Sequence, residues 1–232
     1  MKVKQSASAV LRQMVRRMAL VNLWLVASFG AALAAEAAAP LRIVAFGDSL
    51  TAGYMLAQRD AFPEQLAAAL EAKGYPVEIA NAGVSGDTTA AGLERFDWAI
   101  PEGTDAVIVE LGANDALRGI DPDVTRANLD HILAKLRERN IDVLIAGMKA
   151  PKNWGKDYET RYETIFADLA AKHGALLYPF FLDGIAMDAE LNLEDGLHPT
   201  ASGVGVIVER ILPKVEELIG RVRDRRASSS KS

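Results

Sequence analysis

Cysteine is absent from the 232-residue chain. This absence excludes disulfide bonds, thiolate metal sites, a cysteine nucleophile and lipid attachment through an N-terminal cysteine. The fold must therefore be stabilised by its hydrophobic core. Half of the residues are apolar, which suffices for one ordinary globular domain and an additional terminal segment.

Acidic residues are absent from the first 17 positions, which carry five basic ones. An apolar stretch follows from Met18 to Ala35 and ends in alanine-rich sequence. This arrangement is typical of a secretory signal peptide. We predict a signal peptide over residues 1–39, cleaved between Ala34 and Ala39, and an exported protein that is periplasmic or secreted. An uncleaved N-terminal anchor is the alternative, since the apolar run approaches the roughly 20 residues that span a membrane.

The chain that remains after cleavage is strongly acidic. Removing residues 1–34 takes away five of the 26 basic residues and none of the 31 acidic ones, so the net charge falls from −5 to about −10. A surface of this sign repels phosphate backbones. Nucleic acid is therefore not an expected partner.

Apolar strand-like runs alternate with helix-like runs, a pattern that indicates the α/β class. We expect strands at residues 41–46, 76–80, 105–111, 141–147 and 175–178. Helices are expected at residues 61–73, 88–98, 123–139, 158–172 and 201–221. Continuous apolar runs such as residues 106–109 suit strands buried on both faces of a parallel sheet. We find no repeat and no second domain, and predict one domain over residues 40–222 and a disordered tail over residues 223–232.

Three polar motifs follow the first three predicted strands. Ser49 lies in a Gly-Asp-Ser-Leu motif after the first strand, Gly83 follows the second, and Asn114 lies in Gly-Ala-Asn-Asp after the third. Ligands of open α/β sheets bind outside the carboxyl ends of the strands. These three residues, distant in sequence, are therefore expected to meet at one edge of the sheet.

A carboxylate and an imidazole occur together near the C-terminus. Asp195 and His198 are three residues apart, and the proline after His198 disfavours helical geometry there. A carboxylate that accepts from one imidazole nitrogen fixes the tautomer whose other nitrogen can remove a serine proton. His131 and His173 lie on predicted helices, so His198 is the candidate base and Ser49 the candidate nucleophile. Taken singly, such a serine is often a helix cap and Asp-x-x-His a surface turn.

Asn114 and Gly83 are candidate donors to a tetrahedral oxyanion. The Asn114 side-chain amide can donate a hydrogen bond without carrying charge, and Gly83 offers a backbone N–H where a side chain would obstruct a substrate. The alternative for both is ordinary turn chemistry, with the asparagine capping and the glycine turning the chain.

In this order and at these separations, the four blocks resemble those of the SGNH, or GDSL, hydrolase superfamily. The resemblance covers nearly all of residues 41–213. Within the superfamily, the chain is most similar to bacterial periplasmic esterases described as acyl-CoA thioesterase I, lysophospholipase L1 or arylesterase, through residues 47–54, 85–89, 109–119 and 151–158. The resemblance implies a flavodoxin-like three-layer α/β/α sandwich with a five-stranded parallel sheet in the order 2-1-3-4-5.

The resemblance also implies roles for the motif residues. Ser49 would be the nucleophile, His198 the base and Asp195 the group that orients it, with Ser49, Gly83 and Asn114 as oxyanion-hole donors. It implies no metal and no organic cofactor.

The expected protein is a serine esterase that hydrolyses carboxylic esters and thioesters through an acyl-enzyme on Ser49. Its expected substrates are small acyl esters or thioesters, including aryl esters, acyl thioesters and lysophospholipids, some of them at lipid or membrane surfaces, and we expect a monomer. Trp154 is a candidate lid residue. Candidates for the acyl site, each also explicable as core, are Leu111, Leu117, Phe180, Phe181 and Leu197.

Two other functions are compatible with parts of the sequence. A carbohydrate O-acetyl esterase uses the same four blocks with a tighter or more polar pocket. A flavin-phosphate-binding module could use the first loop of such a sheet without hydrolysis, but it would leave Asp195 and His198 without a role.

Overall fold

A five-stranded sheet lies at the centre of the structure, a computed structural model that describes residues 39–229. Every neighbouring pair of strands is parallel, and their spatial order is β2-β1-β3-β4-β5. The expected fold class is confirmed. The predicted signal peptide lies outside the described residues, apart from Ala39. The strands are β1 (Leu41–Gly47), β2 (Val77–Gly83), β3 (Ala106–Glu110), β4 (Asp142–Ala146) and β5 (Leu176–Tyr178).

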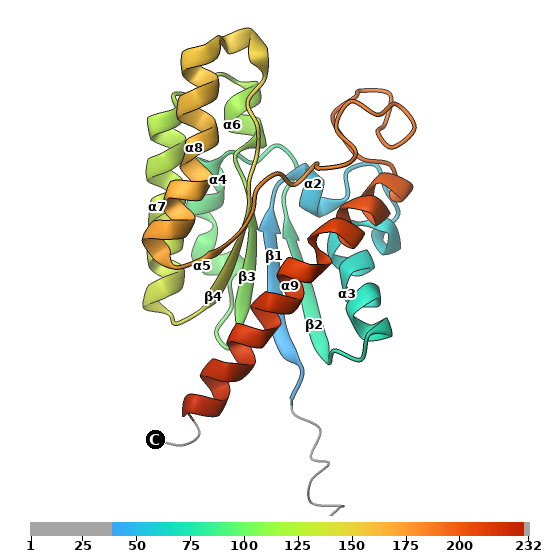
Figure 1. Ribbon diagram of the computed structural model, residues 1–232, viewed down its shortest axis with the longest axis vertical. Coiled ribbons are helices and arrows are strands. Elements are labelled where there is room, and N and C mark those ends of the chain that lie inside the picture. The colour runs from blue at the N-terminus through green and yellow to red at the C-terminus, as the bar shows by residue number, and fades with distance from the viewer. Residues whose placement is uncertain (1–38, 230–232) are drawn as a thin grey trace, which may run out of the picture. The chain divides into compact units, whose positions relative to one another are not determined.

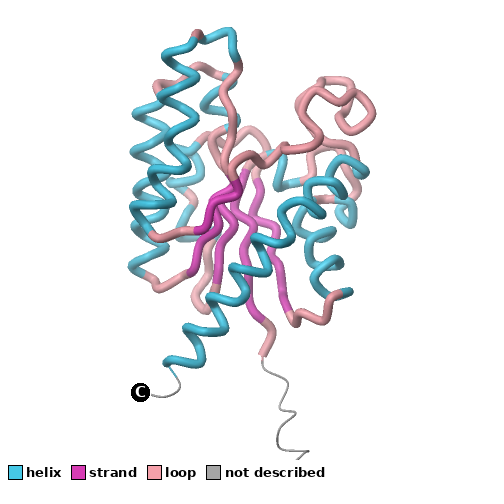
Figure 2. The backbone as a smooth tube through the Cα atoms, viewed as in Figure 1, coloured by secondary structure: helices cyan, strands magenta, loops and turns pink. Residues whose placement is uncertain are grey.

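Helices cover both faces of the sheet, as Figure 1 shows. On one face, α3 (Phe62–Ala72) packs beside α9 (Ala201–Ser229), and on the other α7 (Pro122–Glu138) packs beside α8 (Lys156–His173). The shorter α4 (Thr89–Glu94) and α5 (Phe96–Ala99) lie on the same side as α7. Figure 2 shows the strands between these two helical layers. Within residues 39–229, no helix combines the length and the apolar character needed to cross a bilayer.

The core forms where helical stripes meet strands that are buried on both faces. All five residues of β3 are buried, and β1 is buried except at Arg42. On α7, the buried residues Leu129, Ile132, Leu133 and Leu136 follow the i, i+3, i+4, i+7 spacing of one helical face. That face packs against the sheet and leaves the charged residues of α7 toward solvent.

The motif segments contain short helices that the sequence did not predict. α2 (Ser49–Ala52) and α6 (Ala113–Leu117) follow β1 and β3. Helices of one turn carry too little hydrophobic periodicity to be recognised. The helix predicted over residues 88–98 is divided into α4 and α5 at Arg95, where ψ changes to 4°.

The last helix is longer than predicted. α9 continues to Ser229, so the predicted disordered tail is wrong for residues 223–229. Arg225 donates to Asp142 at 2.8 Å, and Arg226 donates twice to Asp105, at 3.0 and 2.6 Å. Asp105 also accepts from the backbone N–H of Arg42 at 2.8 Å. These contacts hold the end of α9 against the amino edge of the sheet. Because they are tertiary contacts, the polar sequence of the tail alone does not predict the helix.

Replacing Asp105 tests this anchor. Asp105→Ala is expected to lower the free energy of unfolding by about 2 kcal/mol, because a mostly buried carboxylate with several hydrogen bonds is lost. Urea unfolding followed by circular dichroism measures the change. In the control Asp97→Ala, the lost partner Lys135 lies 2.8 Å away on the surface, and the cost should stay below about 1 kcal/mol. Equal losses in the two variants would contradict the anchoring role.

Candidate active site

The carboxyl ends of β1, β2 and β3 meet at one level of the sheet. In the parallel register, Gly47 at the end of β1 lies opposite Gly83 on β2 and opposite Glu110 on β3. The strand order reverses beside β1, which makes this edge the expected ligand crevice of an open α/β sheet. In Figure 1 this edge lies at the upper end of the strands, beside α2.

Ser49 begins α2, directly after the end of β1. The cap of α2 is Asp48, whose carboxylate accepts from the backbone N–H of Leu50 at 3.0 Å. Gly53 ends the helix in the left-handed conformation, with φ at 79°. The helix-cap alternative for Ser49 therefore fails, because the neighbouring aspartate occupies that role and leaves the serine hydroxyl for other contacts.

His198 reaches Ser49 across the site. Its Nε2 lies 2.9 Å from Ser49 Oγ, and its Nδ1 lies 2.6 Å from Asp195 Oδ2. The three side chains form a continuous line of hydrogen bonds from carboxylate to imidazole to hydroxyl. This is the geometry in which an imidazole can take a proton from a serine.

The loop that carries Asp195 and His198 is closed by its own hydrogen bonds. Asp195 Oδ1 accepts from the backbone N–H groups of Leu197 and His198 at 2.8 and 3.0 Å. Leu193 donates its N–H to the His198 carbonyl at 2.7 Å. The backbone bonds from His198 and Leu197, followed by the bond from the His198 ring, lower the pKa of Asp195 to about 2. The carboxylate is therefore ionised at neutral pH.

Gly83 and Asn114 both lie against Asp48, in the turn of residues 47–50 that carries Ser49 and is called the Ser49 turn below, and each already has an internal partner. Asn114 Nδ2 donates to Asp48 Oδ2 at 3.1 Å and to the Asp87 carbonyl at 3.0 Å. Gly83 donates its N–H to Asn81 Oδ1 at 3.1 Å. The structure thus brings both candidates to the site, with their donors held in place by acceptors of the protein.

Comparison with known proteins identifies the family. The model of the GDSL-like Lipase/Acylhydrolase family matches residues 45–206. The chain belongs to this family.

The relatives of this GDSL-family hydrolase carry esterase and thioesterase names. It is 36% identical over 168 residues to an arylesterase of Vibrio mimicus, across 72% of this chain and 84% of that protein. It is 31% identical over 185 residues to thioesterase 1/protease 1/lysophospholipase L1 of Escherichia coli, across 79% and 88%. The crystal structure of AlinE4, a SGNH-hydrolase family esterase, matches with 44% identity and a TM-score of 0.65 over 77% of this chain and 96% of that one. The resemblance inferred from the motifs is confirmed.

Three further side chains of this GDSL-family hydrolase adjoin the site, and sequence reasoning missed them. The Tyr54 ring lies on the His198 imidazole, with ring centroids 4.5 Å apart and planes at 37°. Arg95 donates to Asp87 Oδ2 at 2.5 Å and to the Gly47 carbonyl at 2.9 Å, and so joins the loop after β2 to the end of β1. Glu110 lies buried under the Ser49 turn. The available signal was position, because Tyr54 and Glu110 belong to the same motif segments as Ser49 and Asn114.

The candidate acyl-site residues divide between core and surface. Leu111 and Phe181 are fully buried core residues, whereas Leu117 and Leu197 are each 46% exposed. Trp154 lies at the end of a short 3-10 helix and donates its indole N–H to the Ala116 carbonyl at 2.8 Å. Leu117 and Leu197 therefore remain as apolar surface, and Trp154 is fastened to α6 next to Asn114.

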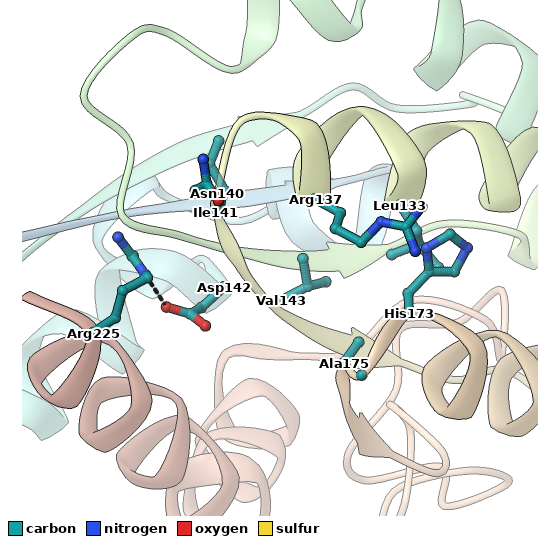
Figure 3. Close-up of a pocket in the computed structure, with 10 residues that line it drawn as sticks. Leu133, Arg137, Asn140, Ile141, Asp142, Val143, His173, Ala175 and Arg225 are labelled. Atoms are coloured by element: carbon teal, nitrogen blue, oxygen red, sulfur yellow. Dashed lines mark hydrogen bonds and ion pairs between the residues drawn. The ribbon is translucent and has the colours of Figure 1, made fainter. Parts of the chain in front are cut away.

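A cavity of about 210 Å³ lies away from this site, at the amino edge of the sheet (Figure 3). Residues at the start of β4 and the end of α8 line it, including Val143 and His173. His173 Nε2 lies 2.6 Å from Asp130 Oδ1, and its Nδ1 has no hydrogen-bond partner among the described residues. His173 thus forms a pair like that of His198 and Asp195, without a serine at the other nitrogen. Residues 39–229 contain no group of three or more His, Asp or Glu that could hold a metal ion.

Gly83→Ala tests the close packing of the Ser49 turn. An added Cβ would lie 2.3 Å from the Ala52 nitrogen and 2.8 Å from the Asp48 carbonyl oxygen. We expect α2 to shift, with a loss of about 1–3 kcal/mol in stability and at least a roughly 10-fold loss of ester hydrolysis. Thermal unfolding and a p-nitrophenyl ester assay measure the two effects.

The matched control is Gly220→Ala in α9, where an added Cβ meets nothing described within 4 Å. This variant should be neutral or gain up to about 1 kcal/mol, since alanine favours helix over glycine. Wild-type activity in Gly83→Ala would contradict the packing argument.

Proposed function

We propose that this GDSL-family hydrolase cleaves carboxylic esters and thioesters through an acyl-enzyme on Ser49. The observation that supports this most directly is the line of hydrogen bonds from Asp195 through His198 to Ser49, at 2.6 and 2.9 Å. Membership of the family and the names of its relatives support the reaction class, and they remove the reason to invoke a flavin-binding module.

In the first step, Ser49 Oγ attacks the substrate carbonyl carbon while His198 Nε2 takes the hydroxyl proton. Asp195 accepts from Nδ1–H throughout, holds the imidazole in the required tautomer and stabilises the imidazolium that forms. Collapse of the tetrahedral intermediate breaks the bond to the leaving group. His198 gives its proton to the departing alcohol or thiol, and the acyl group remains on Ser49.

In the second step, water replaces the leaving group. His198 removes a proton from water as its oxygen attacks the acyl carbon, and returns that proton to Ser49 Oγ as the carboxylic acid departs. Both steps pass through an oxyanion, for which we assign the N–H of Ser49, the N–H of Gly83 and the Asn114 amide as donors. An oxyanion is a stronger acceptor than the neutral oxygens of Asn81 and Asp87, so it can draw or share these donors as charge develops.

The exposed apolar residues around Ser49 suggest where an acyl chain would lie. Tyr54, Leu117 and Leu197 are between 43% and 46% exposed, and each belongs to a segment that carries a proposed catalytic group. We infer that these side chains receive the acyl or aryl part of the substrate, including acyl chains presented by lysophospholipids. Every proposed catalytic residue comes from one chain, so a monomer is sufficient for activity. Export remains a prediction from the N-terminal sequence.

Ser49→Ala is the direct test of the nucleophile. We expect hydrolysis of p-nitrophenyl esters, from acetyl to palmitoyl, to fall by at least about 1000-fold in this variant, because the bond-forming atom is removed. The control is Ser228→Ala, whose hydroxyl donates to the Asp224 carbonyl far along α9 and should leave activity intact. Activity in Ser49→Ala equal to that of the wild type would disprove the assignment.

The same ester series separates the proposed function from the O-acetyl esterase alternative. A lipid or aryl esterase should retain activity beyond acetyl, whereas activity that collapses beyond acetyl would favour a carbohydrate O-acetyl esterase.

Asp195→Asn tests the orienting carboxylate. We expect kcat to fall by about 1000- to 10 000-fold with KM within a few-fold, since an amide stabilises the wrong imidazole tautomer.

The pKa of Asp195, about 2, also means that this carboxylate stays charged between pH 4 and pH 9, so loss of wild-type activity toward acid reflects protonation of other groups. Steady-state kinetics across this range measures both effects. Asp183→Asn, a change at an exposed surface ion pair, is the control, and a loss below about 10-fold in Asp195→Asn would rule out the orienting role.

A further inference from the structure

Two carboxyl groups without a part in the proposed reaction lie buried behind Ser49. Asp48 and Glu110 are both fully inaccessible to solvent. Asp48 directly precedes Ser49, and Glu110 ends β3 in register with Gly47. Two ionised carboxylates in such a place would repel each other in a medium of low dielectric, so one of them must carry a proton.

Glu110 holds the Ser49 turn from below. Its Oε2 accepts from the Thr51 hydroxyl at 2.8 Å and lies 3.4 Å from the Asp48 nitrogen. A Cβ added to Gly47 would lie 2.7 Å from the same Oε2, which places the carboxyl group directly against the turn. Glu110 Oε1 has no hydrogen-bond partner within residues 39–229. Glu110 therefore contacts the segments before and after Ser49.

Asp48 carries the contact onward to the proposed oxyanion donor. One of its oxygens accepts from the Leu50 N–H at 3.0 Å and the other from Asn114 Nδ2 at 3.1 Å. An ionised carboxylate suits these two donors. The Asp48 carboxylate thus fixes both the start of α2 and the orientation of the Asn114 amide.

We propose that Glu110 is a positioning residue that acts as a neutral carboxylic acid, holding the Ser49 turn directly and the Asn114 amide through Asp48. The inference rests on the proposed function, because it assigns Glu110 to the same reaction. If Glu110 is neutral, Asp48 carries the only negative charge of this buried pair. A second negative charge there would repel the oxyanion that forms near Ser49.

The environments of the two carboxyl groups support this division of charge. Burial, reinforced by the charge of Asp48, holds the pKa of Glu110 well above its usual value. Burial also raises the pKa of Asp48, to about 6, but the hydrogen bonds from Leu50 and Asn114 and the nearby His198 oppose the rise. From α8, the buried Tyr162 hydroxyl donates to the carbonyl of Gly112, two residues after Glu110, at 2.7 Å, and burial holds the pKa of Tyr162 well above the ordinary value. From the α4–α5 junction, Arg95 approaches through its bond to the Gly47 carbonyl.

The first test compares Glu110→Ala with Glu110→Gln in the p-nitrophenyl ester assay. Removal of the carboxyl group should lower kcat by about 10- to 100-fold with KM within a few-fold, because a small misplacement of a reacting group by a change outside the chemistry can cost about 100-fold. Glutamine keeps an oxygen for Thr51 and Asp48 and an N–H in place of the acid proton, so it should recover most of that loss. Thr51→Val, which deletes one of these contacts, should give a smaller decrease and covers the case in which Glu110→Ala does not fold.

The second test measures, through stability, whether the buried pair of Asp48 and Glu110 holds a proton. An unfolded glutamate ionises above about pH 4.3, whereas a neutral native Glu110 keeps its proton, so its stabilising effect is complete below that pH and is lost progressively as pH rises. The melting temperature of Glu110→Gln minus that of the wild type should therefore increase between pH 5 and pH 8. Glu209→Gln, at an exposed position on α9, should show no such trend.

Either of two results would overturn the inference. A pH-independent difference in melting temperature would mean that Glu110 is ionised in the native protein, and a Glu110→Gln enzyme as impaired as Glu110→Ala would mean that the charge is required. Failure of the proposed function is a separate outcome, since a wild type without esterase activity would still show the pH trend in stability.

Discussion

The candidate active site depends on the close approach of three backbone segments at the level of Gly47. A Cβ at this position would lie 2.1 Å from Thr51 Oγ1, and one at Gly83 would lie 2.3 Å from the Ala52 nitrogen. Because both positions are glycine, α2 sits directly on the ends of β1 and β2. The sheet therefore fixes the position of Ser49. The loops that carry His198 and Asn114 then place those side chains against a serine that does not move. Sites at the carboxyl edge of parallel sheets commonly have this arrangement.

Carboxyl groups on opposite sides of Ser49 have opposite environments. Asp195 is partly exposed and accepts two backbone N–H groups, which keep its pKa near 2, whereas burial raises that of Asp48 to about 6. In the proposed reaction, this partly exposed carboxylate stabilises the positive imidazolium of His198. The buried pair of carboxyl groups instead holds uncharged hydrogen-bond donors of the site in place. Burying these two groups costs desolvation free energy, and proteins retain such a local loss of stability at functional sites.

The sequence predicted the sheet and the reacting groups better than their surroundings. Apolar strand-like runs identified all five strands, and the motifs predicted Ser49, Asp195 and His198, which the structure brings into contact. The one-turn helices α2 and α6 were not predicted, because hydrophobic periodicity can be recognised only over several turns. The end of α9 was not predicted to be helical, because its ion-pair partners Asp105 and Asp142 lie more than 80 residues earlier in the chain. The role of Glu110 depends on burial, and a glutamate at the end of a strand reads from sequence as a solvated group.

The loop with Asp195 and His198 has a consequence for how such sites diversify. Its internal bonds, from Asp195 to two backbone N–H groups and from Leu193 to the His198 carbonyl, make the base and its carboxylate a preassembled unit. A single distance, from His198 Nε2 to Ser49 Oγ, connects that unit to the nucleophile. Insertions on either flank of the loop can thus change the chain around it without breaking the bond from Asp195 to His198, which sets the tautomer of the proposed base.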